Sequence, residues 1–260
     1  MPDEATRRHD DWVSPSLRAT ESNRAAYELK FVVDLSLAAE IEVWAHRHLL
    51  LDPHADPALG NRYRITSLYF DTPTFDVAQR SAGYKQDKHR IRRYGEADVV
   101  HLERKTKANG CSVKERSTMP HEHLAKPVAD WAHAWFVAET TERNLAPTAI
   151  ITYERTAFGG MAYGGPVRMT FDRNARGAAA RDFRCDPPTD GMALLTEQVI
   201  IEMKYLDVPP VLFKDAIAAF RLEPTGLSKY RRFAAAAGWL PVDDRSNETT
   251  EGTIDHARMA

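Results

Sequence analysis

Apolar and polar residues alternate along eight segments of the chain, the pattern of strands that bury one face. The last segment contains VIIEMKYL, in which Glu202 and Lys204 stand two residues apart within an apolar run. Side chains alternate faces along a strand, so these two charges share a face. The pattern predicts a mostly antiparallel sheet or barrel with eight strands, over residues 25–33, 62–71, 85–94, 99–107, 111–119, 148–158, 166–173 and 197–206.

Four other segments have the period of a helix with one apolar face. Asp34 is placed to cap the first of them, in which Leu37, Ile41 and Trp44 share a face, and Pro127 stands near the start of the second. Together with the strands they predict an α+β fold in which helices flank the sheet. The predicted helices cover residues 34–50, 126–139, 208–222 and 227–238.

The chain is predicted to form one domain over residues 24–240, with disordered ends over 1–23 and 241–260. No run approaches the roughly 18 to 20 apolar residues of a membrane span. The first residues lack the apolar core of a signal peptide. Two cysteines, Cys111 and Cys185, give neither a disulfide framework nor a zinc pattern. These features predict a soluble cytoplasmic protein.

The overall charge argues against a general binder of nucleic acid or membranes. The 260 residues carry a formal net charge of -2, whereas such binders usually have an excess of positive charge. Hydrophobic residues make up 43% of the chain, which is enough for a sizeable core. Any site for an anion must therefore arise from local clustering, and segment 84–116 shows it, with ten Lys and Arg against five Asp and Glu.

An E-x-K pair occurs three times within predicted strands, as Glu28 with Lys30, Glu103 with Lys105, and Glu202 with Lys204. In the first and the last pair the flanking residues are apolar, as expected for a strand with one charged face and one buried face. A single pair of this kind is usually part of a solvated face with cross-strand ion pairs. Three copies, together with R-I-R at residues 90–92, favour a dedicated charged interior.

Asn109-Gly110 is the strongest short hairpin signal in the chain. A two-residue loop there places Lys105 opposite Lys114 and Glu103 opposite Arg116. Like charges directly opposite each other destabilise a sheet, so an anion between the lysines is expected. The turn near Gly95 puts residues 88, 90 and 92 on the same face of the sheet as Glu103 and Lys105.

If the sheet closes, its interior is lined by many cations and a few carboxylates. Cations in such number cannot share an unfilled, desolvated interior, whereas a water-filled tunnel that holds a phosphate chain suits them. The carboxylates could hold Mg²⁺ or Mn²⁺ together with phosphate oxygens. The expected cations are Lys30, Arg90, Arg92, Lys105, Lys114, Arg155, Arg168 and Lys204, and the expected carboxylates are Glu28, Glu103, Asp172 and Glu202.

Four other features admit two interpretations each. Asp71 could bind a ligand, although a turn cap is the better interpretation. The histidines of HEH, residues 121–123, are favoured as surface residues over a metal site, and Tyr153 could either contact a ligand or fill the barrel. The pairs Gly159-Gly160 and Gly164-Gly165 indicate a flexible hairpin connection rather than a phosphate loop.

Nine short motifs resemble, in order, those of VTC-type polyphosphate polymerase domains, which belong to the triphosphate tunnel metalloenzymes. The resemblance covers residues 24–233, and the order of the motifs is more specific than any one of them. The motifs are YELKF, SLYFDT, KHRIRRYG, LERK, VKER, YERTAF, VRMTFDR, IEMK and LSKYRRF.

The resemblance implies an eight-stranded antiparallel tunnel that binds ATP with Mn²⁺ or Mg²⁺ and transfers the γ-phosphate to a growing polyphosphate chain. Glu202 resembles the metal ligand, and Ser228 and Lys229 resemble a phosphate contact at a helix start. Related CYTH hydrolases open with E-x-E-x-K, whereas Ala26 stands at the first glutamate position here, which disfavours triphosphatase or cyclase chemistry. The implied catalytic and phosphate-binding residues are Lys30, Arg90, Arg92, Lys105, Lys114, Arg155 and Arg168.

Polyphosphate synthesis from ATP is the favoured hypothesis. Hydrolysis of tripolyphosphate or another organic triphosphate is the first alternative, because only the attacking group differs. A non-catalytic module that binds polyphosphate or inositol phosphates is the second. A reader of nucleic acid is disfavoured, because few aromatic residues interleave with the basic strands. Some related polymerases also have a phosphate-sensing domain and membrane helices, and neither is expected in this sequence.

Overall fold

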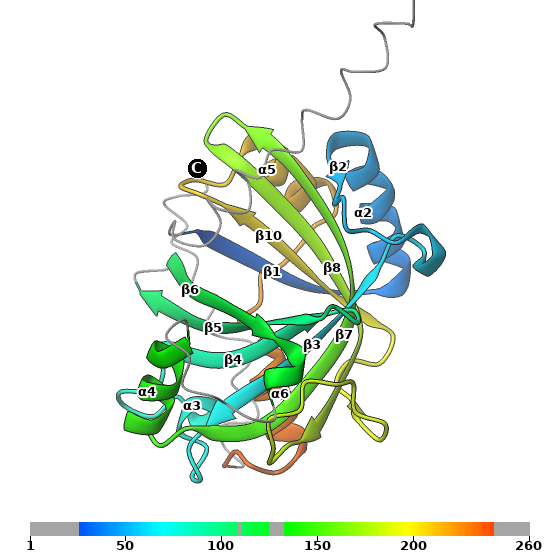
Figure 1. Ribbon diagram of the computed structural model, residues 1–260. Helices are drawn as coiled ribbons and strands as arrows, with labels where there is room; N and C mark the ends of the chain where they lie inside the picture. The colour runs from blue at the N-terminus through cyan, green and yellow to red at the C-terminus, as the bar shows by residue number, and fades with distance from the viewer. Residues whose placement is uncertain (1–25, 109–110, 125–132, 242–260) are drawn as a thin grey trace, which may run out of the picture.

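The computed structural model describes residues 26–108, 111–124 and 133–241, and its main element is a ten-stranded antiparallel sheet (Figure 1). The long strands follow the order β1-β10-β8-β7-β3-β4-β5-β6. Their bounds are β1 Tyr27–Asp34, β3 Tyr63–Asp71, β4 Asp87–Tyr94, β5 Val99–Ala108, β6 Cys111–Pro120, β7 Ala146–Ala162, β8 Gly165–Ala179 and β10 Gln198–Tyr205.

The predicted α+β class and antiparallel sheet are confirmed, with two additions. Two short strands, β2 Leu50–Leu51 and β9 Met192–Ala193, pair with β7 and β8. Both are too short for an alternation of apolar and polar residues to reveal them. The predicted terminal segments lie outside the described residues, apart from Pro241.

The sheet closes less completely than the predicted barrel would. The sheet curls until β1 and β6, the two ends of the strand order, lie near each other (Figure 1). Among the described residues one bridge joins them, just before β1, in which Ala26 N donates to Ser112 O at 3.2 Å and Ser112 N donates to Ala26 O at 2.9 Å. The fold is therefore a curled sheet that is closed at one point rather than a barrel with a continuous ladder.

The β5–β6 hairpin has the predicted register. Lys105 lies opposite Lys114, Glu103 opposite Arg116 and Ala108 opposite Cys111. Asn109 and Gly110, from which this register was predicted, lie outside the described residues.

The glycine pairs occupy different places in the β7–β8 hairpin. Ala162 pairs with Gly165, so the turn contains Gly164, as expected of a hairpin connection. Gly159 and Gly160 instead lie inside β7, where they pair with Arg168 and Val167, so the prediction that they belong to the connection is wrong. A Cβ at Gly160 would come within 2.9 Å of the end of the Leu49 side chain, so β7 packs closely against Leu49 at this point.

Two helices cover the outer face of the half-sheet formed by β1, β10 and β8. They are α2, Leu35–His48, and α5, Val211–Ala219 (Figure 1). Val199, Ile201 and Met203 of β10 are fully buried on this face, so Glu202 and Lys204 face the interior of the curl, as the alternation predicts. Burial of these apolar side chains fixes which charged residues point inward.

The remaining helical elements cap the other half and one end of the sheet. α2 begins as predicted, because the Asp34 side chain accepts a hydrogen bond from Leu37 N at 2.8 Å. The predicted start of the second long helix near Pro127 lies outside the described residues. The elements are α3 Asp76–Gln79, α4 Ala134–Glu142, α6 Lys229–Ala236 and two 3-10 turns, Pro57–Leu59 and His121–His123.

Helix α6 docks against the interior side of the sheet. Tyr230 stacks on Tyr69 with ring centroids 5.1 Å apart, and Phe233 packs so closely on Gly177 that a side chain there would come within 2.6 Å of it. These contacts hold the first residues of α6 beside the charged interior. No helix in the described part of the chain is both long and apolar enough to cross a membrane.

Candidate functional site

Three lysines form a row across β4, β5 and β6. Lys88 lies opposite Lys105, which in turn lies opposite Lys114. Burial, with Lys30 and Lys204, lowers the pKa of Lys105 to about 8, although Glu28 opposes the shift. Burial also lowers the pKa of Lys114 to about 8, with Arg116 adding to the effect and Glu103 opposing it. The lowered pKa values show that the protein without ligand disfavours the positive charge that this row of lysines carries.

The next row across the same strands alternates in sign. Glu103 lies between Arg90 and Arg116, and its side chain is completely buried. Arg90 Nε donates to one Glu103 oxygen at 2.7 Å, and Arg116 Nε donates to the other at 2.8 Å. Burial raises the pKa of Glu103, but Arg90, Lys114 and Arg92 outweigh it and hold the pKa well below its usual value. Glu103 thus fixes two guanidinium groups.

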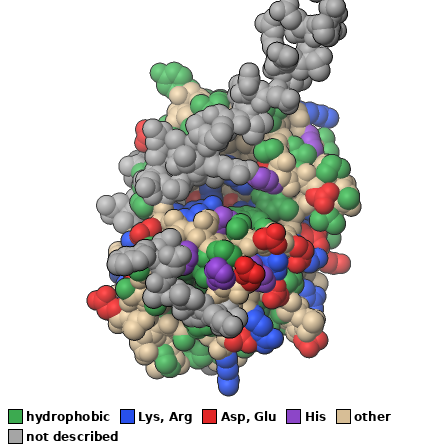
Figure 2. Space-filling model, in the orientation of Figure 1, with side chains coloured by type: hydrophobic (Ala, Val, Ile, Leu, Met, Phe, Trp, Pro, Cys, Tyr) green, Lys and Arg blue, Asp and Glu red, His purple; other side chains and the backbone are tan. Residues whose placement is uncertain are grey.

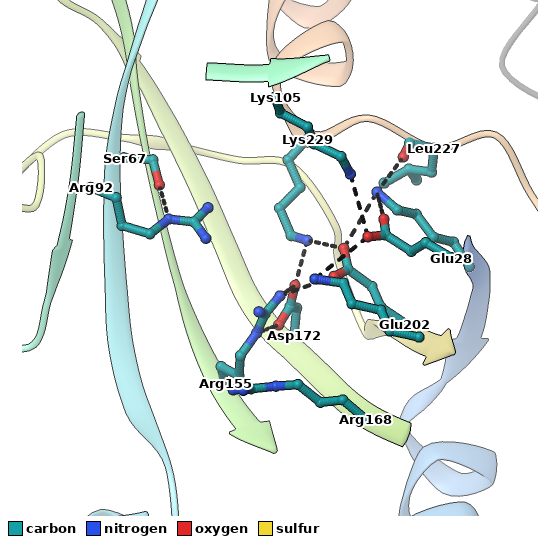
Figure 3. Close-up of polar contacts among 12 residues, drawn as sticks. Glu28, Ser67, Arg92, Lys105, Arg155, Arg168, Asp172, Glu202, Leu227 and Lys229 are labelled. Carbon is teal, nitrogen blue, oxygen red and sulfur yellow. Dashed lines mark hydrogen bonds and ion pairs between the residues drawn. The ribbon is translucent and has the colours of Figure 1, made fainter. Parts of the chain in front are cut away.

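A buried cluster on the facing wall joins β7, β8, β10 and α6 (Figure 3). Arg155 donates to both oxygens of Asp172, at 2.6 and 2.7 Å, and reaches Glu202 at 3.2 Å. Lys229, the first residue of α6, contacts the same two carboxylates. Burial raises the pKa of Glu202, but Lys30, Lys229 and Arg155 outweigh it and hold the pKa well below its usual value.

Glu28 links the two walls near the point of closure (Figure 3). It contacts Lys30 at 3.0 Å, Lys105 at 3.3 Å and Lys204 at 3.6 Å, so it joins β1, β5 and β10. The lysines of all three E-x-K pairs therefore meet at Glu28, whereas Glu103 contacts Arg90 and Arg116 instead. In the space-filling view this middle region is hollowed, with Lys and Arg side chains visible in the hollow (Figure 2).

Arg92 and Arg168 lie on either side of this cluster (Figure 3). Arg92 Nε donates to Ser67 Oγ at 3.0 Å, and among the described residues no carboxylate lies within ion-pair distance of Arg92 or of Lys88. Arg168 has partners, since it donates to Asp52 at 2.9 Å and to Tyr63 Oη at 3.1 Å. Arg92 and Lys88 are thus cations of the interior that have hydroxyl partners rather than carboxylates.

Tyrosines also line the interior. Lys229 Nζ lies 4.6 Å from the ring centre of Tyr153, and the Arg155 guanidinium lies 5.3 Å from it. Burial raises the pKa of Tyr94, but Arg92 and other cations outweigh it and lower the pKa to about 7. Tyr153 fills the interior, as one interpretation of the sequence has it, and contacts two of its cations, whereas its contact with a ligand stays a prediction.

The predicted cations and carboxylates of the interior, together with Ser228 and Lys229, face this interior or its edge. Ser228 is the side-chain cap of α6 and contacts Lys88 at 3.0 Å. Three residues escaped the prediction as site members: Lys88 shares the predicted face but was not counted, Arg116 was seen only as a partner of Glu103, and Tyr94 shares the face of Arg90 and Arg92 but was not considered. Strand alternation could have identified all three.

Two other candidates lie apart from the interior cluster. Asp71 accepts hydrogen bonds from Thr72 N, Val77 N and Ala78 N, so it is the cap that the sequence favours. The histidines of residues 121–123 form a 3-10 turn after β6.

Two carboxylates of the interior fit a divalent ion. No group of three or more His, Cys, Asp or Glu side chains in the described ranges is placed to hold a metal by itself. Glu28 and Glu202 nevertheless converge on the Lys30 ammonium, at 3.0 and 3.4 Å. Mg²⁺ is commonly held by one or two carboxylates with water and substrate phosphates, which matches this pair. Asp172 and Glu103 fit less well, because guanidinium groups occupy both oxygens of each.

The curled antiparallel sheet with a charged interior is the arrangement that the motifs of the sequence led us to expect. The sequence matches the VTC domain over residues 25–237, and the chain therefore belongs to the VTC domain family. A comparison with curated proteins finds no match.

Similar solved structures share little sequence with this chain. One is a protein from Hippeastrum studied as an adenylyl cyclase, with a dominant triphosphatase activity; it is 14% identical, with a TM-score of 0.47, over 84% of this chain and 98% of that chain. Another is a protein from Vibrio parahaemolyticus studied as an adenylate cyclase, which is 11% identical, with a TM-score of 0.44, over 82% and 99% of the two chains.

Proposed function

We propose that the protein is a metal-dependent phosphotransferase that binds ATP and polyphosphate in its charged interior and synthesises polyphosphate. The row of Lys88, Lys105 and Lys114 is the observation that supports this most directly. Lysines opposite each other destabilise a sheet unless an anion lies between them. A phosphate chain supplies closely spaced negative charges of the kind that lysine and arginine bind well.

The arginines have a second part in the proposal. Arg90 and Arg155 are each held by a buried carboxylate, so their guanidinium groups are oriented before any ligand binds. Oriented cations stabilise the charge that develops on the oxygens of a transferred phosphoryl group and need little rearrangement to do so. Lys30, Lys105, Lys114, Arg92, Arg168, Lys204, Ser228 and Lys229 complete the proposed phosphate contacts.

Glu202 and Glu28 would hold Mn²⁺ or Mg²⁺ together with phosphate oxygens. The ion would neutralise phosphate charge when bound. Arg155, Lys229 and Lys30 keep Glu202 ionised and in place, since all three contact its oxygens. A divalent ion would share these oxygens with the lysines, so we expect metal binding to strengthen when phosphate is present.

Synthesis is favoured over hydrolysis because an acceptor phosphate is already anionic and needs no base to attack. Positioning and charge neutralisation could supply most of the catalysis. Such a reaction needs ATP, which the predicted cytoplasmic location would supply.

Incubation of the purified protein with ATP and either Mn²⁺ or Mg²⁺ tests the proposal, with polyphosphate and free phosphate measured separately. Polyphosphate is the expected product. Free phosphate alone, from ATP or tripolyphosphate, would establish the hydrolase instead. Thermal stabilisation by polyphosphate without turnover under any metal would establish a binding module.

A further inference from the structure

An apolar patch lies at one end of the sheet, outside the charged interior. Met161 and Tyr163 form it at the turn of the β7–β8 hairpin, and Val208 and Val211 form it where the chain passes from β10 into α5. Met161 is 61% exposed, Val211 is 72% exposed and Tyr163 is fully exposed. Figure 1 shows this hairpin turn at the top of the view, beside α5. Large apolar side chains gathered on a surface in this way usually mark a contact site.

A shallow groove joins the two parts of this patch. It lies between the hairpin turn and the segment that follows β10, where a Cβ at Gly165 would come within 2.9 Å of the Leu206 side chain. The described residues that line it include none with a charge, so the groove suits an apolar segment rather than an anion or a metal. Its lining includes Ala162, Pro166, Tyr205, Leu206, Val208 and Pro210.

The chain enters the described structure beside this groove. Tyr27 stacks on Tyr205 with ring centroids 5.8 Å apart, and Tyr205 lines the groove. Residues 1–25 come before this point and lie outside the described residues. The groove is therefore the first apolar surface that the preceding segment meets.

One part of that segment is suited to cover the patch. Residues 1–25 are mostly polar, but Trp12, Val13 and Leu17 place three large apolar side chains within six residues. An extended chain spans about 3.3 Å per residue, so the nine residues from Leu17 to Ala26 can reach up to about 30 Å. Burial of an indole ring removes a large apolar area from water, so Trp12 is the expected centre of the contact.

The other end of the chain leaves the described structure at a different place. Trp239 stacks on Phe75 with ring centroids 4.5 Å apart, close to α3 and α6, and Pro241 is the last described residue. In Figure 1 α3 and α6 lie low in the view, away from the turn of the β7–β8 hairpin. Residues 242–260 contain no aromatic residue. The C-terminal segment is therefore the poorer candidate to cover the patch.

We infer that residues 12–17 dock on the patch of Met161, Tyr163, Val208 and Val211 in the same chain, with the Trp12 side chain against it. The N-terminal segment then forms a strap across one end of the sheet. This refines the expectation that residues 1–23 are disordered, because it gives one part of them a docking site. The inference needs neither phosphate nor metal, so it is separate from the proposed function.

Photochemical crosslinking of the full chain tests which segment covers the patch. Tyr163→p-benzoylphenylalanine places the photoreactive group on the patch at a fully exposed position, and mass spectrometry identifies the peptide that it captures. We expect capture of residues 12–17 within one chain. Val137→p-benzoylphenylalanine is the matched control on α4, also at an exposed apolar residue, and should not capture this segment. Capture of a second copy, capture of no segment, or equal capture from both positions would overturn the inference.

Hydrogen exchange provides a second measurement on variants without the photoreactive group. In W12S the amides of residues 161–167 should exchange about tenfold faster than in the original protein, because the strap no longer protects the turn. I254S makes a similar loss of apolar surface in the C-terminal segment and should leave these amides unchanged. Unchanged exchange in W12S would contradict the docking. Both measurements are made without ATP or polyphosphate, so the inference and the proposed synthesis can fail separately.

Discussion

Arg155 donates two hydrogen bonds, of 2.6 and 2.7 Å, to the two carboxylate oxygens of Asp172 inside the curled sheet. The same guanidinium reaches Glu202 at 3.2 Å, so one arginine connects a carboxylate with an orienting function to the carboxylate proposed to bind metal. Asp172 has no exposed surface, and Lys229 completes its contacts. The proposed catalytic centre is therefore also part of the framework that holds α6 to the sheet.

Replacement of Asp172 by Asn should destabilise the protein strongly. The change leaves Arg155 and Lys229 without their shared charge partner, and loss of one member of a buried ion pair costs about 3 kcal/mol or more. Urea unfolding measures the free energy of unfolding. The matched control is E154Q, since Glu154 and its partner Arg62 are only half-buried and loss of this pair should cost less than about 1 kcal/mol. Similar small losses in both variants would contradict this prediction.

Replacement of Glu202 by Gln should separate turnover from binding. The amide keeps the shape of the side chain but removes the charge that a divalent ion needs, so turnover with Mn²⁺ should fall by about a hundredfold or more. Tripolyphosphate measured without metal should bind at least as tightly as before, because a negative charge has left the interior. Normal turnover in E202Q would show that the metal site lies elsewhere.

Lys105 and Arg90 should differ in their effect on the protein without ligand. K105Q removes a charge that faces two other lysines, so the Tm should rise. R90Q removes a partner of the buried Glu103, so the Tm should fall. Both variants should bind tripolyphosphate more weakly, by about tenfold, or about 1.4 kcal/mol. A lower Tm in K105Q with unchanged affinity would identify Lys105 as a structural ion-pair residue.

Binding should take up protons at mildly alkaline pH. In the folded protein without ligand, the pKa of Lys105 and of Lys114 is about 8, against an ordinary value of 10.5. Phosphate favours the charged lysines, so a ligand bound near pH 8 should draw protons from solution, and affinity should decrease as the pH rises above 8. Calorimetry in buffers with different ionisation enthalpies measures this uptake, which should shrink in K114Q.

The same lysines should affect stability in the opposite direction. Between about pH 8 and 10.5 the unfolded chain binds more protons at these two residues than the folded chain does. Their contribution to the free energy of unfolding therefore rises over this interval when no ligand is present. Urea unfolding compared between the original protein and K105Q across this interval isolates the effect. A contribution that falls with pH would contradict the assigned pKa shift.

Alternation along the strands was enough to predict which charged residues face inward. The prediction for Glu202 and Lys204 succeeded because the residues between and beside them are needed for the core beneath α2 and α5. The opposition of Lys105 and Lys114 followed from one turn dipeptide, since a two-residue loop determines the register of a hairpin.

Contacts between distant segments could not be predicted in this way. Alternation carries no information on which segment approaches a strand from inside, so the docking of Ser228 beside Lys88 was not foreseen. The place of Ser228 and Lys229 in the site came only from the resemblance to a family. The incomplete closure of the sheet was also not predicted. The approach of β1 to β6 depends on the curvature of the whole sheet rather than on the sequence of either strand.

The pairing of β1 with β10 has a consequence for folding of the protein during its synthesis. Tyr27 lies opposite Tyr205, so the first long strand finds its partner only after most of the chain has been synthesised. Pairing between segments so distant in sequence is slow, and β1 must remain without this partner until β10 has left the ribosome. Lys30 meets Glu202 through this pairing, and Lys229 follows still later. The part of the charged interior that β1, β10 and α6 form is therefore among the last parts of the molecule to assemble.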